Sequence, residues 1–230
     1  MIASEGNALG AALSAAREIP RTQVYLVGGP SGAGKTALAT AISEVQRAFV
    51  IHLDDYFRDE IDVILQGSKR FGRAPQWDRP ASVDLPLACR NLSELSSANQ
   101  TALPTFSFSA NRRIGYRKVR SEAGQPVIVE GIHALRLRQC ARKIASEVCC
   151  IFVDAKRGVR KERAKQRDAY ERGREVSDFE RRFYFILKAE EKWISWQEKL
   201  ADIVFDTTVT GVFRNVKSAK RRYDRSYGCG

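Results

Sequence analysis

The stretch that most constrains this chain is a glycine-rich run, Gly28 to Thr36, set between an apolar segment and a helical one. Residues 23–27 are β-branched, aromatic and aliphatic, which is typical of a buried strand. Residues 37–45 repeat apolar side chains at helical spacing. The glycines allow successive N–H groups to point inward, and the new helix adds partial positive charge at its N-terminus. A strand, a glycine loop and a helix in this order predict a nest for a polyphosphate.

The residues of the loop are expected to bind different parts of a Mg²⁺-nucleotide. Lys35 is expected to reach the β- and γ-phosphates as a mobile point charge and to act in catalysis. The Thr36 hydroxyl is expected to hold the Mg²⁺ ion that bridges them. The other members are expected to cradle the nucleotide: Gly29, Pro30, Ser31, Gly32, Ala33 and Gly34. ATP and Mg²⁺ are therefore the expected cofactors.

Composition favours one globular domain over residues 1–230, with no membrane partner, because no stretch approaches the roughly 20 apolar residues that span a bilayer. Residues 8–19 predict a short packing helix ended by Pro20 rather than a signal peptide. The five cysteines are odd in number and lack Cys-x-x-Cys spacing, which favours reduced thiols in a cytoplasmic protein. With only His52 and His133, no zinc site is expected.

The net charge of +12 is localised in three segments, 111–120, 156–174 and 211–230. Basic patches of this kind can track a phosphate backbone. Two of them, however, fall where an enzyme needs cations for its own nucleotide, and the third predicts a solvated basic tail. We therefore do not expect nucleic acid as a partner.

Acidic residues follow two predicted strands, where an open parallel sheet binds its ligands. Residues 48–53 run into Asp54, the candidate general base for a hydroxyl that attacks a γ-phosphoryl group and a candidate Mg²⁺ ligand. Capping the next turn is the alternative for Asp54, and for Asp55 it is the favoured interpretation. Glu130, at the end of strand 126–130, is expected to hold Mg²⁺ directly or through water.

Two more strands, 148–154 and 201–205, complete an α/β fold. The prediction is a P-loop NTPase-type three-layer sandwich with a five-stranded parallel sheet. A strand at 101–108 and a turn at 111–116 suggest a small antiparallel insert, about 99–120, over the acceptor side.

Trp77 and Asp78 lie in a predicted loop, where an aromatic ring can stack on a ligand and a carboxylate can bind ribose hydroxyls. A tryptophan that covers the edge of the core is an equally good interpretation.

The helix after the fourth strand carries arginines at three- and four-residue spacing, and the loop after it carries two more. Such a row can form a lid, about 156–176, that stabilises charge during phosphoryl transfer, although a solvated face is the usual fate of charge runs. Of these arginines Arg163 and Arg167 are assigned to catalysis and Arg172 and Arg174 to the nucleotide; the row begins with Arg157 and Arg160.

Several separated blocks together resemble the uridine kinase and phosphoribulokinase branch of the phosphate-loop kinases. The blocks are Gly28–Thr36, Asp54–Phe57, Trp77–Pro80, Val129–Ile132, Phe152–Asp154, Arg167–Asp168 and Glu171–Arg174. The resemblance implies Mg²⁺-ATP as donor, a hydroxyl of a small molecule as acceptor, Asp54 as base, Asp78 on the ribose and lid arginines near the phosphates. It also implies a cytoplasmic kinase, most like a uridine or nucleoside kinase, that is often a homo-oligomer.

The acceptor side departs from that family. Uridine kinases have a Pro-x-Tyr-Asp-Phe stretch followed by a histidine, whereas this chain has Phe106 at the tyrosine position and Asn111 at the histidine position. Ala164 also replaces one lid arginine. Acceptor contacts are expected from Asp54, Tyr56, Trp77, Asp78, Phe106, Asn111, Arg113 and Glu130.

These changes leave the acceptor open. Ribulose 5-phosphate or another sugar phosphate, nicotinamide riboside and pantothenate are the alternatives to uridine, and the cations around Arg113 slightly favour a phosphorylated acceptor. A nucleotide-binding module without catalysis is a further alternative. A GTP-hydrolysing switch is disfavoured because an Asn-Lys-x-Asp element is absent, and a motor ATPase because Glu130 is followed by Gly131 rather than paired with an aspartate.

Overall fold

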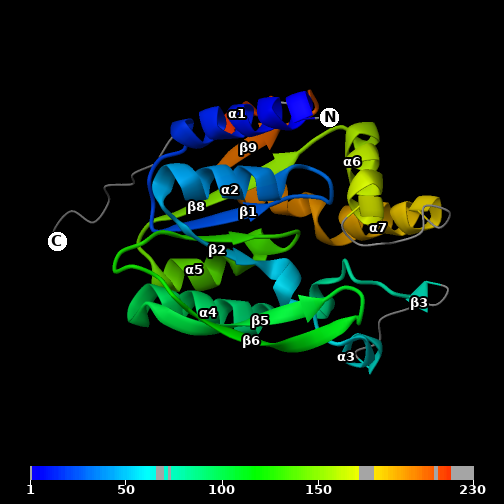
Figure 1. The fold of residues 1–230 in the computed structure, drawn as a ribbon, viewed down its shortest axis with the longest axis horizontal. Helices are drawn as coiled ribbons and strands as arrows, with labels where there is room; N and C mark the ends of the chain where they lie inside the picture. Colours follow the sequence, from blue (N-terminus) through cyan, green and yellow to red (C-terminus); the bar gives the residue numbers. More distant parts are fainter. Residues whose placement is uncertain (1, 66–69, 72–73, 171–178, 210–211, 219–230) are drawn as a thin grey trace, which may run out of the picture.

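The computed structural model describes residues 2–65, 70–71, 74–170, 179–209 and 212–218. Over these ranges the chain is an α/β protein built on one central sheet, as Figure 1 shows. Within the same ranges, none of the helices combines the length and apolar character that crossing a bilayer requires.

The central sheet has six strands in the order β10-β9-β8-β1-β7-β2. Five of them are parallel neighbours, as predicted, and Leu26 of the central strand lies opposite Val129 on one side and Cys150 on the other. β10 is antiparallel to β9 and was not predicted, because its residues lie in the expected basic tail. The strands are β1 (Val24–Gly28), β2 (Phe49–His52), β7 (Val127–Glu130), β8 (Val148–Asp154), β9 (Ile203–Asp206) and β10 (Arg214–Ser218).

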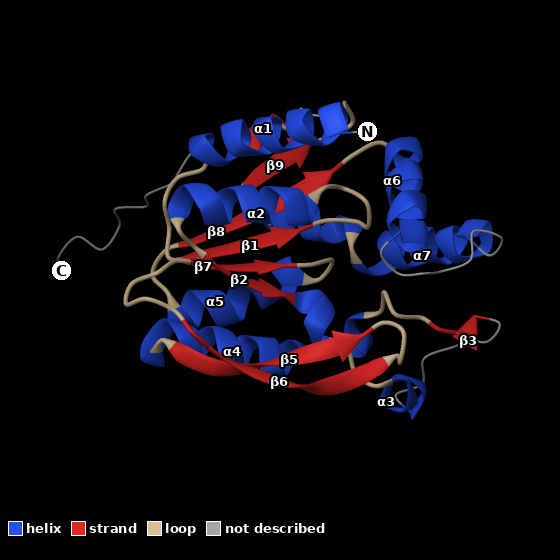
Figure 2. Cartoon of the chain, viewed as in Figure 1, coloured by secondary structure: helices blue, strands red, loops and turns tan. Residues whose placement is uncertain are grey.

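Helices cover both faces of this sheet, and Figure 2 shows α1 and α2 on one side with α4 and α5 on the other. The α-helices are α1 (Ile2–Glu18), α2 (Lys35–Gln46), α3 (Glu60–Leu65), α4 (Leu85–Ala98), α5 (Arg138–Ile144), α6 (Arg157–Tyr170) and α7 (Phe179–Trp193). Short 3₁₀ turns join them: η1 (Leu53–Tyr56), η2 (Pro80–Ser82), η3 (Ala134–Leu137) and η5 (Ser195–Leu200). The predicted N-terminal packing helix is α1.

The core is divided into two layers by the alternation of side chains along the strands. In β1, Leu26 packs in one layer, which includes α4 and α5 residues such as Leu92 and Ala141. Its neighbour Val27 packs in the other, with α1 and α2 residues such as Ala16 and Leu38. Because both faces are covered, the central strands are apolar throughout, as their sequences indicated.

The insert on the acceptor side is an antiparallel hairpin of β5 (Gln100–Ser107) and β6 (Arg112–Arg120). The expected turn at 111–116 is therefore wrong over most of its length, because those residues already pair with β5. The hairpin lies on the outer side of α4 in Figure 1. A second small pair, β3 (Arg70–Phe71) with β4 (Ala74–Pro75), precedes it in the chain.

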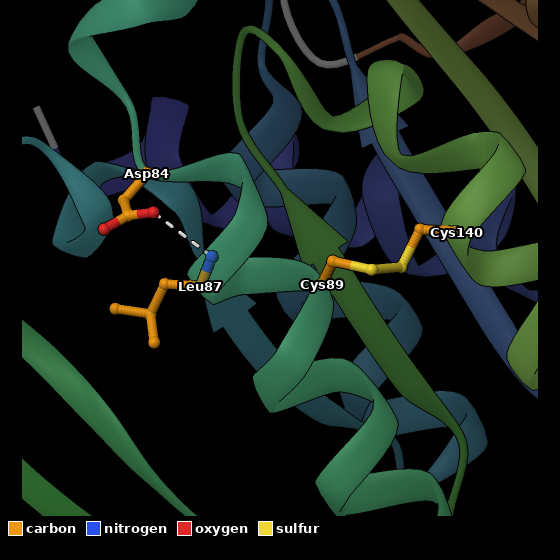
Figure 3. The surroundings of a disulfide bond; sticks show 4 residues. All are labelled: Asp84, Leu87, Cys89 and Cys140. Atoms are coloured by element: carbon orange, nitrogen blue, oxygen red, sulfur yellow. Dashed lines mark hydrogen bonds between the residues drawn. A yellow bond between two sulfur atoms is a disulfide. The ribbon is translucent and has the colours of Figure 1, made fainter.

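Helix α4 is fixed at two points, which Figure 3 shows together. Its N-terminus is capped by Asp84, whose side chain accepts from the Leu87 N–H at 3.2 Å. Further along, Cys89 forms a disulfide with Cys140 of α5, with Cα atoms 6.1 Å apart. The prediction of reduced thiols is wrong for Cys89 and Cys140. The two cysteines are 51 positions apart in the sequence and come together only because α4 and α5 pack against each other.

Two of the remaining cysteines lie in the central sheet. Cys149 and Cys150 are buried as thiols in β8. Burial raises the pKa of Cys150 to about 12, so its thiol stays protonated. Cys229 lies outside the described residues.

Candidate active site

The glycine loop joins β1 to α2 at the carboxyl end of the sheet, as predicted. Gly29 and Gly32 have φ values of 137° and 77°. A Cβ atom at Gly29 would overlap the Val153 carbonyl oxygen, and one at Gly32 would lie 2.5 Å from the Arg160 carbonyl oxygen. Both positions therefore require glycine for backbone conformation and for space.

Lys35 is the buried centre of the site. Its Nζ donates to the Pro30 carbonyl at 2.9 Å, so the ammonium curls back over the loop. Burial lowers the pKa of Lys35, and the nearby Arg167 lowers it further, whereas the carboxylates of Glu130, Asp54 and Asp78 raise it. Those four charged groups come from four segments that are far apart in the sequence. The structure thus brings the predicted donor-side and acceptor-side residues within electrostatic reach of one ammonium.

Two oxygen donors lie side by side next to Lys35. The Thr36 hydroxyl is 3.4 Å from Oε1 of Glu130, which is only 5% exposed at the end of β7. Mg²⁺ prefers such oxygen ligands and usually takes one or two from the protein, with the rest from phosphates and water. Thr36 and Glu130 would supply such protein oxygens, and among the described residues no group of three or more His, Cys, Asp or Glu side chains could hold a metal.

His52 shares the same carboxylate. Its Nδ1 lies 2.8 Å from Oε1 of Glu130, and this hydrogen bond raises the pKa of His52 more than burial lowers it. His52 was not predicted as a site residue, because a histidine at the end of a buried strand is usually structural.

Asp54 and Asp55 occupy η1, directly after β2. The charge of Asp54 raises the pKa of both Lys35 and His52, so its carboxylate lies near both side chains, and its role as base stays a prediction. Asp55 differs, because burial raises its pKa and its carboxylate lies 4.0 Å from Arg117 of the hairpin.

Tyr56 requires a correction. Its side chain has no exposed surface, and its hydroxyl donates to Oδ1 of Asn91 on α4 at 2.9 Å. Asn91 in turn donates to the Thr101 hydroxyl at 2.7 Å. Tyr56 is therefore a buried support for the acceptor side rather than an acceptor contact.

Four aromatic rings meet on the acceptor side. Phe57 and Trp77 lie 5.6 Å apart, and Trp77 lies 5.8 Å from Phe106. Phe108 completes the group at 5.4 Å from Phe106. Phe57 and Phe106 are buried, whereas Trp77 and Phe108 are partly exposed, so this aromatic group both extends the core and presents ring surface outward. Trp77 therefore covers the edge of the core, and its contact with a ligand stays a prediction.

Two arginines beside the hairpin, Arg113 and Arg58, share the carboxylate of Asp84. Arg113 lies 3.7 Å from Oδ2 of Asp84 and donates to the Tyr116 hydroxyl at 3.1 Å. Arg58 binds the other oxygen of Asp84 at 3.3 Å. Asn111 has a φ of 52° in the hairpin turn, and its carbonyl accepts from the Glu60 N–H of α3 at 3.2 Å, so its backbone is held by the turn and by α3.

Three of the four arginines of α6 bind different protein partners. Arg160 is buried and forms a two-pronged ion pair with Glu190 of α7, at 2.6 and 2.8 Å. Arg163 donates to the Thr207 hydroxyl and carbonyl, both at 2.9 Å. Arg167 donates to the Ser31 hydroxyl at 2.9 Å. Among the described arginines of the predicted row, two reach the phosphate loop: Arg163 at the Gly32 carbonyl, 3.5 Å away, and Arg167 at the Ser31 hydroxyl.

The rest of the lid is held by an apolar contact. Ala164, which stands where a further arginine was expected, is buried against Phe179 and Phe183 of α7. A charged side chain at that position would lie in the contact between the two helices. Arg172 and Arg174 lie outside the described residues.

Sequence reasoning missed Thr207, which follows β9. Its hydroxyl donates to the Ala33 carbonyl at 2.8 Å and accepts from Arg163, so it links the lid helix to the phosphate loop. A single threonine after a strand carries no sequence signal for such a role.

Comparison with known proteins agrees with this geometry. The model of the "Phosphoribulokinase / Uridine kinase family" matches residues 24–212. Uridine-cytidine kinase C of Dictyostelium discoideum is 32% identical over 127 residues, which are 54% of this chain and 26% of that protein. A uridine kinase of Lactobacillus johnsonii is 25% identical over 183 residues, 77% of this chain and 83% of that one. The solved structure of a "Possible Uridine Kinase" from Bacillus stearothermophilus shares the fold, with a TM-score of 0.57 at 18% identity over 87% of this chain and 98% of that chain.

Proposed function

The chain belongs to the phosphoribulokinase / uridine kinase family and is a kinase, and from that premise we propose that it transfers the γ-phosphoryl group of ATP to a hydroxyl of a nucleoside. One arrangement carries the proposal. Around the buried Lys35, Arg167 donates to Ser31 of the phosphate loop at 2.9 Å and Thr36 lies 3.4 Å from Glu130, and the charges of Asp54 and Asp78 also act on Lys35.

The proposed reaction is an in-line displacement. The acceptor oxygen attacks the γ-phosphorus, the bond from that phosphorus to the bridging oxygen breaks, and ADP leaves. A carboxylate oxygen of Asp54 takes the hydroxyl proton. Lys35 and the loop N–H groups balance the phosphate charge, and Arg167 adds positive charge from the lid side. When bound through Thr36 and Glu130, Mg²⁺ neutralises phosphate oxygens.

The acceptor site suits a molecule with a planar ring. The exposed faces of Trp77 and Phe108 offer apolar contact, with Phe57 and Phe106 packed behind them. We assign to Asp78, in the same loop as Trp77, the binding of ribose hydroxyls.

The charges on this side favour an uncharged acceptor over a sugar phosphate. Arg113 and Arg58 share the single carboxylate of Asp84, and Arg117 lies 4.0 Å from Asp55, so these three arginines already have acidic neighbours. A phosphorylated acceptor such as ribulose 5-phosphate would have to compete for them. This reverses the weak preference that the basic sequence of the hairpin suggested.

An ADP-release assay with Mg²⁺-ATP tests the proposal. The acceptor panel comprises uridine, cytidine, purine nucleosides, nicotinamide riboside, pantothenate and ribulose 5-phosphate. We expect acceptor-dependent turnover with a nucleoside. Turnover with ribulose 5-phosphate or pantothenate alone would overturn the acceptor assignment, and nucleotide binding without turnover on any acceptor would indicate a non-catalytic module.

A further inference from the structure

The turn that follows β7 contains a fully buried histidine that the proposed reaction does not use. His133 is 0% exposed and lies three residues beyond Glu130, at the start of η3. Its Nε2 lies 3.0 Å from the Asp78 carbonyl oxygen. The contact joins the turn that carries the metal-side acid to the loop that carries the acceptor-side acid, across 55 positions of sequence.

The chemistry of this contact fixes the protonation of the ring. A carbonyl oxygen only accepts, so Nε2 must carry the hydrogen and donate it. Burial lowers the pKa of His133 to about 3, with Arg136 and Lys35 adding to the effect, so the imidazole is neutral. A single neutral donor therefore holds the backbone carbonyl of Asp78 in its loop.

The turn itself is anchored from the other side. Gln197 of η5 donates to the Ile132 carbonyl at 2.9 Å. Arg136 of η3 donates to the Trp193 carbonyl at 3.1 Å, and the guanidinium of Arg79 lies 5.7 Å from the centre of the Trp193 ring. His133 thus projects from a braced support, and a braced donor can set the position of the loop it binds.

We infer that His133 is a positioning residue that holds the Asp78 loop at a fixed place relative to the phosphate loop. It acts through the backbone of Asp78 and touches neither substrate nor nucleotide. The inference rests on the proposed function, because the loop it positions is the proposed acceptor loop. Its loss should therefore weaken the acceptor side of the reaction and spare the nucleotide side.

Variants of one ring separate this role from general stability. His133→Phe keeps a buried ring and removes the donor, and His133→Gln restores an N–H near the position of Nε2. The matched control is Tyr25→Phe, which also keeps a buried ring and removes a hydroxyl that donates to the Pro20 carbonyl at 3.1 Å. Tyr25 is the second residue of β1 and lies at the opposite end of that strand from the phosphate loop.

Hydrogen–deuterium exchange of residues 76–83 measures how firmly the loop is held, without any substrate. We expect exchange there to rise about tenfold in His133→Phe and to return toward the parent rate in His133→Gln, with no rise in Tyr25→Phe. Equal exchange in the parent and His133→Phe, or an equal rise in the control, would overturn the inference. If His133→Phe does not fold, His133→Asn gives the same contrast, because its shorter amide cannot reach the Nε2 position.

Kinetics supply the second readout, with uridine as acceptor. In His133→Phe we expect kcat/KM for uridine to fall about tenfold while KM for ATP stays within twofold, and His133→Gln should recover most of the loss. Equal losses for both substrates would contradict a positioning role. A parent protein that phosphorylates no nucleoside would instead remove the proposed function, and the exchange experiment would still decide the role of His133.

Discussion

The donor side and the acceptor side of this site are built by different means. On the donor side backbone geometry is decisive: Gly29 and Gly32 have no room for a Cβ atom, and the Lys35 ammonium is held on the Pro30 carbonyl. On the acceptor side, side chains fill the space with aromatic rings and paired charges. A backbone nest tolerates little change in sequence, whereas a side-chain pocket can be altered residue by residue. Phosphoryl transfer can therefore be kept while the acceptor changes.

The largest effect should come from the residue where the two sides meet. Asp54→Asn removes the proposed base and keeps the shape, so kcat should fall about 10²–10⁴-fold while ATP affinity is retained. Steady-state kinetics and calorimetric ATP titration measure the two quantities. Asp55→Asn is the control from the same turn and should lose less than tenfold. Comparable kcat values for Asp54→Asn and the parent would rule out Asp54 as base.

Lys35→Met tests the donor side alone. The variant loses a buried cation over the phosphates, and kcat/KM for ATP should fall about 10²–10³-fold. Lys161→Met, which removes an exposed lysine paired with Glu180 at 2.8 Å, should stay within twofold. If both variants bind and use ATP like the parent, the nucleotide does not lie on this loop.

A double variant, Phe106→Tyr with Asn111→His, tests how freely the acceptor side can be changed. It restores two polar groups typical of uridine kinases, and histidine is among the residues that tolerate the left-handed conformation of position 111. We expect kcat/KM for uridine to rise up to about tenfold, with KM for ATP unchanged. A fall for every nucleoside in the panel would show that the rings cannot accommodate these groups.

The smallest effect should come from Tyr56→Phe. Removing its hydroxyl deprives Asn91 of a buried hydrogen bond and should lower the free energy of unfolding by about 1 kcal/mol, measured by urea denaturation. KM for the acceptor should change less than twofold. A large rise in that KM with unchanged stability would restore Tyr56 as an acceptor contact and blur the distinction between support and pocket.

The parallel sheet could be predicted because its strands are short apolar runs that end in functional residues. Gly28, Asp54 and Glu130 mark the carboxyl ends of three strands, and all three predictions of strand position are confirmed within a few residues. The hairpin was harder. In strand β6 the residues are either exposed or only partly buried, and neither face of the strand is buried. It therefore lacks the alternation of apolar and polar residues that identifies a strand.

The misses at the site have a common physical origin. Tyr56 was predicted as a contact because it follows Asp54 and Asp55, but the short 3₁₀ turn directs its ring into the core. Arg160 lies in the predicted row, yet it is buried in an ion pair with Glu190, a partner 30 positions away. Which side chains pair across the fold depends on tertiary packing, and spacing along one helix does not report it.

The antiparallel strand β10 gives the basic C-terminal region a purpose that needs no nucleic acid. An unpaired outer strand invites another chain to add to the sheet, and charged side chains there discourage such association. Without β10, the apolar strand β9 would form that border; instead it is covered by a strand carrying Arg214, which pairs with Asp206 at 2.9 Å, and Lys217. Truncation before residue 212 should therefore show itself first as self-association of the protein and only afterwards as lost catalysis.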